Sequence, residues 1–356
     1  MTPLLFTLLS LISLPTSTPS TPSTPSTPST LRSTSDAWLW QRDHTDVDAI
    51  AEFAAFSSGH LHLLVVDDAF VQHDPRLPAA LVKSHTPAVL TVRLTALRNT
   101  AVVTDTVAWW RARGVDVRAV EIDHDCGVRA LPAYAAWLST LKAALSPTTT
   151  TQTPLWITAL PTWWSQPTHT AVLAAVDDVT VQLHAIRAPA LFDVDDALRF
   201  VRAHPTLRVA LPTYAVTLRS GPAIFARADD VARVRVEARR VAWFRLPTTS
   251  DVTAWSWDTL RAVDAGPVIV TPLATRLAPH ADGAVDIVVV NTGAVDAAFV
   301  DVVVKGALVV DVVAGFVLVD SAGIASVQAR FVAPGHSVVV GWARAAPGEV
   351  VRATVR

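Results

Sequence analysis

The sequence is poor in several residue types on which common protein chemistries depend. Its 356 residues include a single cysteine, Cys126, which excludes a framework of internal disulfides. Glutamate is scarce as well and occurs only at positions 52, 121, 237 and 349. The formal net charge is −2 and no block of basic residues stands out, which argues against a nucleic acid as partner.

Several catalytic signatures are also missing. The chain has no G-x-S-x-G nucleophile elbow, no P-loop and no G-x-G-x-x-G fingerprint. No two of the 11 histidines lie four residues apart, which excludes the H-x-x-x-H pattern of polysaccharide deacetylases. A retaining glycosidase with glutamates on strands four and seven would need a glutamate near Thr213, and none is there.

The amino-terminal residues differ in composition from the rest of the chain. The apolar run from Leu4 to Leu14 is too short to span a bilayer but suits the hydrophobic region of a signal peptide. We therefore predict a signal-peptide-like segment over 1–16, a Ser/Thr/Pro-rich disordered linker over 17–35, and export to the periplasm or the extracellular space. We expect no stable transmembrane span.

From residue 36 onward, β-rich runs alternate with helical patterns. The eight β-rich runs are 37–42, 60–68, 88–94, 117–125, 155–161, 179–186, 207–214 and 241–247. Helical periodicity predicts helices over 46–56, 99–113, 131–145, 194–203, 229–240 and 250–263. Such alternation is typical of a (β/α)8 TIM barrel, which we predict for 36–264. The alternative, an open doubly wound sheet, usually has a glycine-rich first turn, which is missing.

After Gly266, helical periods disappear and valine-rich runs follow one another. Turn residues such as Asn291-Thr292-Gly293 separate these runs. The pattern predicts a small C-terminal antiparallel β-sandwich over 265–356, as an accessory domain. Because the segment has few aromatic residues, we favour a structural role for it over a sugar-binding platform.

One stretch, VDVRAVEIDHDCG at 115–127, places Glu121, Asp123 and Asp125 two residues apart. Side chains alternate between the faces of a strand, so all three carboxyls should point the same way. Clustered carboxyls repel one another, and burying them costs desolvation free energy. The row therefore indicates a solvent-exposed, metal-bound or catalytic site. It ends the fourth predicted strand, at the end of a barrel where catalytic groups lie.

Polar and aromatic residues end the other predicted strands and should meet at the same rim. We predict as substrate-binding residues Gln182, His184, Tyr214, Trp163, Arg93, Asp67, Asp68 and Arg245. Gln182, His184 and Tyr214 would orient a sugar and Trp163 would stack on it. Two alternatives stay open: the Asp67-Asp68 pair as a helix cap, and His184 as a hydrogen-bonded wall residue. The pair His60-Leu61-His62 begins its strand, which places it at the face that serves stability.

The strand motifs resemble those of a known family. The acid row with LPAYAAWLSTLKAAL after it, LWITALPTWW (155–164), VTVQLHAI (179–186) and LRVALPTYAVTL (207–218) is similar to the bacterial domain-of-unknown-function family 3142. The resemblance covers 37–263 and implies a TIM barrel of the glycoside-hydrolase-like superfamily. The E-x-D-x-D row is also similar to the D-x-D-x-E row of chitinase-like glycosidases, but its outermost residue is Asp125 rather than glutamate.

The leading hypothesis is an exported, glycoside-hydrolase-like enzyme that acts on a polysaccharide or oligosaccharide without a cofactor. Asp125 would donate the proton, assisted by Asp123, and Glu121 would tune their pKa values. A second hypothesis is a non-catalytic carbohydrate- or cell-envelope-binding protein on a glycosidase scaffold. A third is a divalent-metal-dependent hydrolase in which the three acids and His184 bind the cation.

Overall fold

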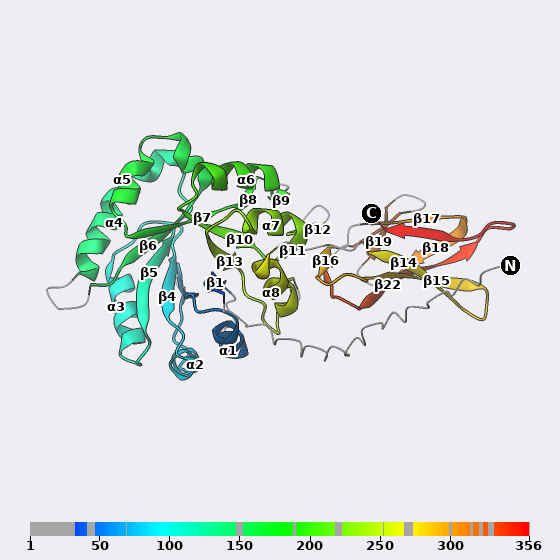
Figure 1. Ribbon diagram of the computed structural model, residues 1–356, viewed down its shortest axis with the longest axis horizontal. Helices are drawn as coiled ribbons and strands as arrows, with labels where there is room; N and C mark the ends of the chain where they lie inside the picture. The colour runs from blue at the N-terminus through cyan, green and yellow to red at the C-terminus, as the bar shows by residue number, and fades with distance from the viewer. Residues whose placement is uncertain are drawn as a thin grey trace, which may run out of the picture. The chain divides into compact units, whose positions relative to one another are not determined.

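The chain forms a parallel barrel with surrounding helices, followed by antiparallel sheets (Figure 1). This computed structural model describes residues 33–40, 47–68, 70–146, 152–187, 190–217, 223–251, 253–266, 273–298, 301–313, 316–319, 323–326 and 331–355. The predicted fold class, a TIM barrel with a C-terminal antiparallel β region, is confirmed.

The predicted signal-peptide-like segment over 1–16 lies outside the described residues, as does most of the linker predicted over 17–35. The end of that linker differs from the prediction. Ser33 forms an isolated β-bridge with Ser57, and the buried Ser35 donates from its hydroxyl to Asp264 Oδ1 at 2.6 Å. The folded part of the chain therefore includes residues before position 36.

Eight parallel strands close into the barrel, as the sequence pattern predicts. They are β1 (Asp36–Leu39), β2 (Leu61–Asp67), β4 (Ala88–Arg93), β5 (Val117–Asp123), β6 (Leu155–Ala159), β7 (Asp178–Gln182), β10 (Arg208–Pro212) and β13 (Arg240–Phe244). Consecutive barrel strands pair with each other, and β1 closes the ring because Ala37 pairs with both Leu61 of β2 and Trp243 of β13. A short strand, β3 (Phe70–Val71), pairs antiparallel with β2.

Helices cover the outside of the barrel (Figure 1). They are α1 (Val47–Phe56), α2 (Arg76–Ser84), α3 (Ala101–Arg111), α4 (Leu131–Leu145), α5 (His169–Ala174), α6 (Val194–Ala203), α7 (Ala228–Arg235) and α8 (Trp257–Ala265), with the 3-10 turns η1 (Val128–Ala130) and η2 (Pro161–Ser165). No helix in the described ranges is long and apolar enough to cross a membrane.

Four helices differ from the sequence prediction, among them α7, which ends at Arg235 rather than at residue 240. Helix α2 carries Pro78 in its first turn, and α5 has six residues, fewer than two turns, so neither gives a strong periodic signal. Helix α8 begins at Trp257 rather than near Ser250. Its cap is Ser256, whose side chain accepts from the backbone N–H of Thr259.

The two faces of the barrel strands differ in polarity. In β5, Val120 and Ile122 belong to the main hydrophobic core, whereas Glu121 and Asp123 point to the barrel interior. This is the alternation expected of a strand. Neighbouring strands add polar and aromatic side chains to that interior, among them Trp38, His62, Thr91, Thr158, Thr180 and Arg208. The barrel therefore has an apolar outer core and a polar inner one.

The C-terminal region consists of two four-stranded antiparallel sheets. One contains β14 (Ala274–Pro279), β15 (Ala284–Val290), β22 (Ser337–Ala345) and β18 (Ala307–Val312); the other contains β19 (Phe316–Val319), β20 (Gly323–Ser326), β17 (Asp301–Lys305) and β23 (Arg352–Val355). Both contribute to one apolar core, with Ile287 from the first sheet and Val302 from the second. This confirms the predicted sandwich.

Three short two-stranded sheets complete the fold. They pair β8 (His184–Arg187) with β9 (Ala190–Phe192), β11 (Ala215–Thr217) with β12 (Ala223–Phe225), and β16 (Ala297–Ala298) with β21 (Phe331–Val332). The first two follow barrel strands β7 and β10 directly. They therefore extend the wall at the carboxyl ends of the strands, where the acid row also ends.

Candidate active site at the carboxyl ends of the barrel strands

The outer two acids of the predicted row share one hydrogen-bond donor. The side-chain amide of Gln182 donates to Asp123 Oδ1 at 3.1 Å and to Asp125 Oδ1 at 3.4 Å. Glu121 lies one step deeper and bonds to groups inside the barrel. The common orientation predicted for the three carboxyls is confirmed, and the barrel adds Gln182 from strand β7 to them.

A cavity of about 200 Å³ lies over the outer two acids. It is lined by Trp38, Trp40, Arg93, Asp123, Asp125, Thr158, Gln182, His184, Ala185, Ala210, Tyr214 and Phe244. Six of these residues were predicted from the sequence as site residues: Arg93, Asp123, Asp125, Gln182, His184 and Tyr214. The fold therefore brings together residues from seven of the barrel strands around one space, as a TIM-barrel site requires.

Asp123 is the buried acid of this cavity, with 4% of its surface exposed. Thr158 donates to its Oδ1 at 2.6 Å, and Arg93 Nε lies 3.7 Å from its Oδ2. Burial, and next the negative charge of Asp125, raises the pKa of Asp123 to about 7 against the opposing influence of Thr158. Asp123 is therefore a carboxyl group that can gain or lose a proton near neutral pH.

Asp125 is exposed and lies two residues beyond Asp123. Partial burial raises its pKa, while the charges of Arg93 and His124 and the hydrogen bond from Gln182 lower it. The charge of Asp125 is itself among the causes that raise the pKa of Asp123. Asp125 therefore ionises first, and the proton that the pair retains lies on Asp123.

Glu121 is fully buried yet accepts three hydrogen bonds on one oxygen. Its Oε2 lies 2.8 Å from Trp38 Nε1, 2.9 Å from His62 Nδ1 and 3.0 Å from Thr91 Oγ1. Burial alone would raise the pKa of Glu121, but the charge and hydrogen bond of His62 hold it below its usual value. Glu121 therefore carries a fixed negative charge under the cavity.

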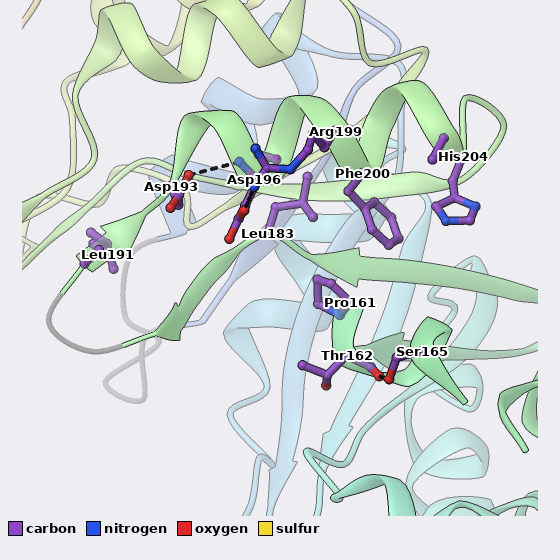
Figure 2. A pocket seen from close by; sticks show the side chains of 13 residues that line it. Pro161, Thr162, Ser165, Leu183, Leu191, Asp193, Asp196, Arg199, Phe200 and His204 are labelled. Carbon is purple, nitrogen blue, oxygen red and sulfur yellow. Dashed lines mark hydrogen bonds and ion pairs between the residues drawn. The ribbon is translucent and has the colours of Figure 1, made fainter. Parts of the chain in front are cut away.

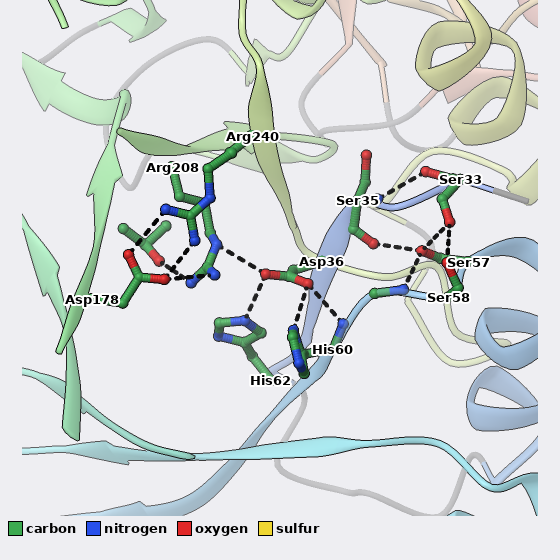
Figure 3. A network of polar contacts seen from close by, with 12 residues as sticks. Ser33, Ser35, Asp36, Ser57, Ser58, His60, His62, Asp178, Arg208 and Arg240 are labelled. Atoms are coloured by element: carbon green, nitrogen blue, oxygen red, sulfur yellow. Dashed lines mark hydrogen bonds and ion pairs between the residues drawn. The ribbon is translucent and has the colours of Figure 1, made fainter. Parts of the chain in front are cut away.

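Below Glu121, charges of alternating sign continue toward the amino ends of the strands (Figure 3). His62 Nε2 lies 3.6 Å from Asp36 Oδ2, and Arg208 bridges Asp36 and Asp178 at 2.9 and 2.8 Å. Burial would lower the pKa of His62, but the two carboxylates on either side raise it. Burial would also raise the pKa of Asp36, yet the hydrogen bond from His60 and the nearby charges of His62 and Arg208 keep it well below its usual range.

From the sequence, the pair His60-Leu61-His62 is predicted at the amino end of the barrel without a connection to the acid row. The structure adds that connection, because His62 pairs in register with Trp38 and both donate to Glu121. The alternation of side chains along β2 could have predicted this contact. Leu61 and Leu63 face the outer core, so His62 must face the barrel interior.

His184 and Tyr214 form one wall of the cavity. His184 Nδ1 lies 3.2 Å from Tyr214 Oη, and its ring stacks on Phe244 at 4.6 Å. Burial lowers the pKa of His184 to about 3 and raises that of Tyr214 to about 12. Both side chains are thus uncharged at neutral pH, which fits the alternative of a hydrogen-bonded wall residue for His184 better than a proton-transfer role.

The prediction that Trp163 stacks on a substrate is wrong. Its side chain is 1% exposed, and its indole donates to the carbonyl of Cys126 at 3.0 Å. The aromatic side chains that line the cavity are instead Trp38, Trp40 and Phe244. Sequence reasoning missed them because β1 and β13 become neighbours only when the barrel closes.

Asp67, Asp68 and Arg245 do not line the cavity. Asp68 accepts from the backbone N–H and the hydroxyl of Thr95, at 2.8 and 2.9 Å, and so holds the loop after β4 rather than a substrate. Asp67 pairs in register with Arg93. Arg245 forms an ion pair with Asp251 at 2.5 Å. The predicted direct substrate contact of all three is therefore not supported.

Asp123 and Asp125 are the acids that line this cavity within the described residues. Asp193 caps helix α6 by accepting from the backbone N–H groups of Asp195 and Asp196. In the same described ranges, no group of three or more His, Cys, Asp and Glu side chains is placed to hold a metal ion. The chemistry available at the cavity is therefore that of two adjacent carboxyls.

Residues 85–238, which contain β5, β7 and the acid row, match the sequence profile described as Domain of unknown function (DUF3142). The match covers less than half of the chain. The resemblance predicted from the strand motifs is thereby confirmed for the part of the barrel that holds Asp123, Asp125 and Gln182. No curated protein matches the chain in sequence.

Two enzymes are among the solved structures that are similar to this chain. One is a GH18 chitinase from Pseudoalteromonas aurantia, with 9% identity, a TM-score of 0.41, and coverage of 60% of this chain and 94% of that one. The other is the spore cortex-lytic enzyme SleL of Bacillus cereus, with 13% identity, a TM-score of 0.41, and coverage of 71% and 63%. The barrel itself is established by its strand pairing.

Proposed function

We propose that the protein is a glycoside-hydrolase-like enzyme that binds a polysaccharide or oligosaccharide in the cavity over Asp123 and Asp125. The observation that carries this proposal is the pair of adjacent carboxyls with separated ionisation, one buried with a pKa near 7 and one exposed. Separated pKa values let two carboxyls act as acid and base at the same pH. The indole ring of Trp40, which is partly exposed, adds flat apolar surface to the cavity.

In the mechanism that this geometry supports, Asp123 supplies the proton and Asp125 acts as the carboxylate. Oδ1 of Asp123 already accepts from Thr158 and Gln182, so the proton belongs on Oδ2. Transfer of that proton to the glycosidic oxygen would assist departure of the leaving group. Ionised Asp125 would stabilise the positive charge that develops on the sugar ring. Water would then add to the anomeric carbon and release a proton to ionised Asp123, which restores the starting state. These roles reverse those expected from the sequence.

The test is hydrolysis of a polysaccharide panel by the wild type, Asp123→Asn and Asp125→Asn. Each substitution should lower kcat/KM by about a hundredfold or more, because a positioned acid or base commonly contributes that much. Asp116→Asn is a matched control, since Asp116 is an exposed acid just before the same strand and pairs with Arg118. Equal turnover by all four proteins would overturn the catalytic assignment.

A second candidate function is non-catalytic binding of carbohydrate or cell-envelope glycan. It is favoured by the lining of the cavity, where no third carboxyl from the described residues faces Asp123 and Asp125. Calorimetry with the same glycans would detect binding without turnover. Retention of that binding in Asp125→Asn would support this candidate, whereas hydrolysis by the wild type would exclude it.

Export is a separate part of the proposal. It is supported by the apolar run from Leu4 to Leu14 and the Ser/Thr/Pro-rich repeat that follows it. Residues 1–35 fused to alkaline phosphatase, which is active only outside the cytoplasm, should give active enzyme. Leu9→Arg within the run should abolish that activity, and equal activity of both fusions would contradict the proposal.

A further inference from the structure

A second and larger cavity lies beside the end of strand β7 (Figure 2). Its volume is about 490 Å³, compared with about 200 Å³ for the cavity over the acids. Its walls come from η2, the β8–β9 hairpin and helix α6, together with Leu183. This volume is within the range of sites that hold small organic ligands.

The inner surface of this cavity is apolar and held in place by packing. Leu183, Leu191 and Ala197 are each at most 5% exposed, so the core fixes their positions. The aromatic ring of Phe200 forms one side of the cavity. Trp164 contacts that ring edge-on at 5.3 Å and His204 lies against it at 4.7 Å. The cavity is therefore formed in advance of any ligand.

The charged groups around the cavity already have partners. Asp193 accepts the backbone N–H groups at the start of α6, and Asp196 forms an ion pair with Arg199. Burial, and next the neighbouring His169, lowers the pKa of His204, so its ring is neutral at pH 7. Because a buried charge needs a compensating partner, this cavity disfavours an ionic ligand.

Two polar groups at the cavity remain available for hydrogen bonding. Within the described residues, neither the Thr162 hydroxyl nor the ring nitrogens of His204 have a hydrogen-bond partner, and Figure 2 shows both side chains at the cavity. We propose that the cavity binds an uncharged small molecule with a flat apolar ring system and a hydrogen-bonding group. Phe200 would contact the ring system, and Thr162 or His204 the polar group.

The proposed site is distinct from the cavity over the acids but adjoins it. Leu183 lies between Gln182 and His184, which line the other cavity. Successive residues of an extended chain point to opposite sides, so a ligand here would contact the outer side of the segment that positions Gln182. The site does not depend on the proposed glycosidase function and can be tested without an activity assay.

The test uses the full chain and N-phenyl-1-naphthylamine, an uncharged two-ring probe with one N–H group that fluoresces in apolar surroundings. We expect saturable binding to one site per chain. Ala203→Trp, at an exposed position on the cavity rim, should weaken binding at least tenfold. Ala136→Trp is the matched control, because Ala136 is an exposed helical alanine that does not line the cavity.

A second measurement identifies the place of binding. With isotopically labelled leucine methyl groups, the bound probe should give nuclear Overhauser contacts to Leu183 and Leu191. Absence of saturable binding would overturn the proposal. So would equal affinity in Ala203→Trp and Ala136→Trp, or contacts to leucines of the C-terminal sheets instead.

Discussion

Each end of the barrel interior contains a buried aspartate, and the pKa of this aspartate is shifted in opposite directions at the two ends. At the amino end, Asp36 lies between His62 and Arg208 within 3.6 Å, and its pKa is lowered. At the carboxyl end, Asp123 has one distant cation, Arg93, and its pKa is raised to about 7. Burial acts in the same direction at both ends, so the number of close positive partners decides the sign.

This difference suits the amino end of the barrel to stability and the carboxyl end to proton transfer. At the amino end, Asp36 is paired with His62 and Arg208. The carboxyl end retains a buried carboxyl whose ionised form is poorly compensated, which is costly for stability and useful for proton transfer. Glu121 forms the boundary, since its hydrogen bonds point to the amino-end network while its charge acts on Asp123.

The largest effect should come from breaking the amino-end network. Arg208→Met would leave Asp36 and Asp178 without their shared partner, and we expect a loss of about 3–5 kcal/mol in the free energy of unfolding. Urea denaturation at pH 7 measures it. Arg118→Met removes an exposed arginine paired with Asp116 and should cost less than about 1 kcal/mol. Similar losses in the two variants would contradict the contrast between the ends.

The second prediction concerns pH at the carboxyl end. The folded-state pKa of Asp123, about 7, exceeds its unfolded value of 3.8, so the folded protein retains a proton that the unfolded chain releases. The free energy of unfolding should therefore fall as pH rises from 4 to 7, by up to about 4 kcal/mol through this group. Asp123→Asn should remove that part of the slope. Thermal unfolding of both proteins across this range checks it, and parallel pH profiles would refute it.

The sequence predicts those features of the molecule that depend on neighbouring residues, and not those that depend on contacts between distant parts of the chain. The strands and the acid row follow from local alternation, and both are confirmed. The aromatic lining from Trp38, Trp40 and Phe244 depends on contacts between the first and last strands, which no local pattern encodes. The prediction for Trp163 is wrong for a related reason, because a position after a strand does not determine whether the side chain turns toward the cavity or toward the core.

The third prediction returns to the amino end. His62 is raised in pKa by Glu121 and Asp36, and the rings of Trp38 and Trp156 pack against it. Its charged form stabilises the fold fully below the unfolded pKa of 6.5, and this contribution is lost as pH rises through the higher folded-state pKa. His62→Gln should therefore cost about 2 kcal/mol at pH 5.5 and progressively less in alkaline solution. A constant difference between pH 5 and 10 would count against a charged His62.

The smallest effect should come from single hydrogen bonds at the carboxyl end, where Asp123 and Asp125 share Gln182 as a donor and Asp123 also accepts from Thr158. Gln182→Leu removes the amide that lowers the pKa of Asp125, and Thr158→Val removes the hydroxyl that lowers the pKa of Asp123. Gln182→Leu should raise the pKa of Asp125, and Thr158→Val should raise the pKa of Asp123, each by the equivalent of a single hydrogen bond. Carbon-13 NMR titration of the aspartate carboxyls distinguishes the two. If both variants shift both acids equally, the pair titrates as one unit and the separate roles assigned to Asp123 and Asp125 are lost.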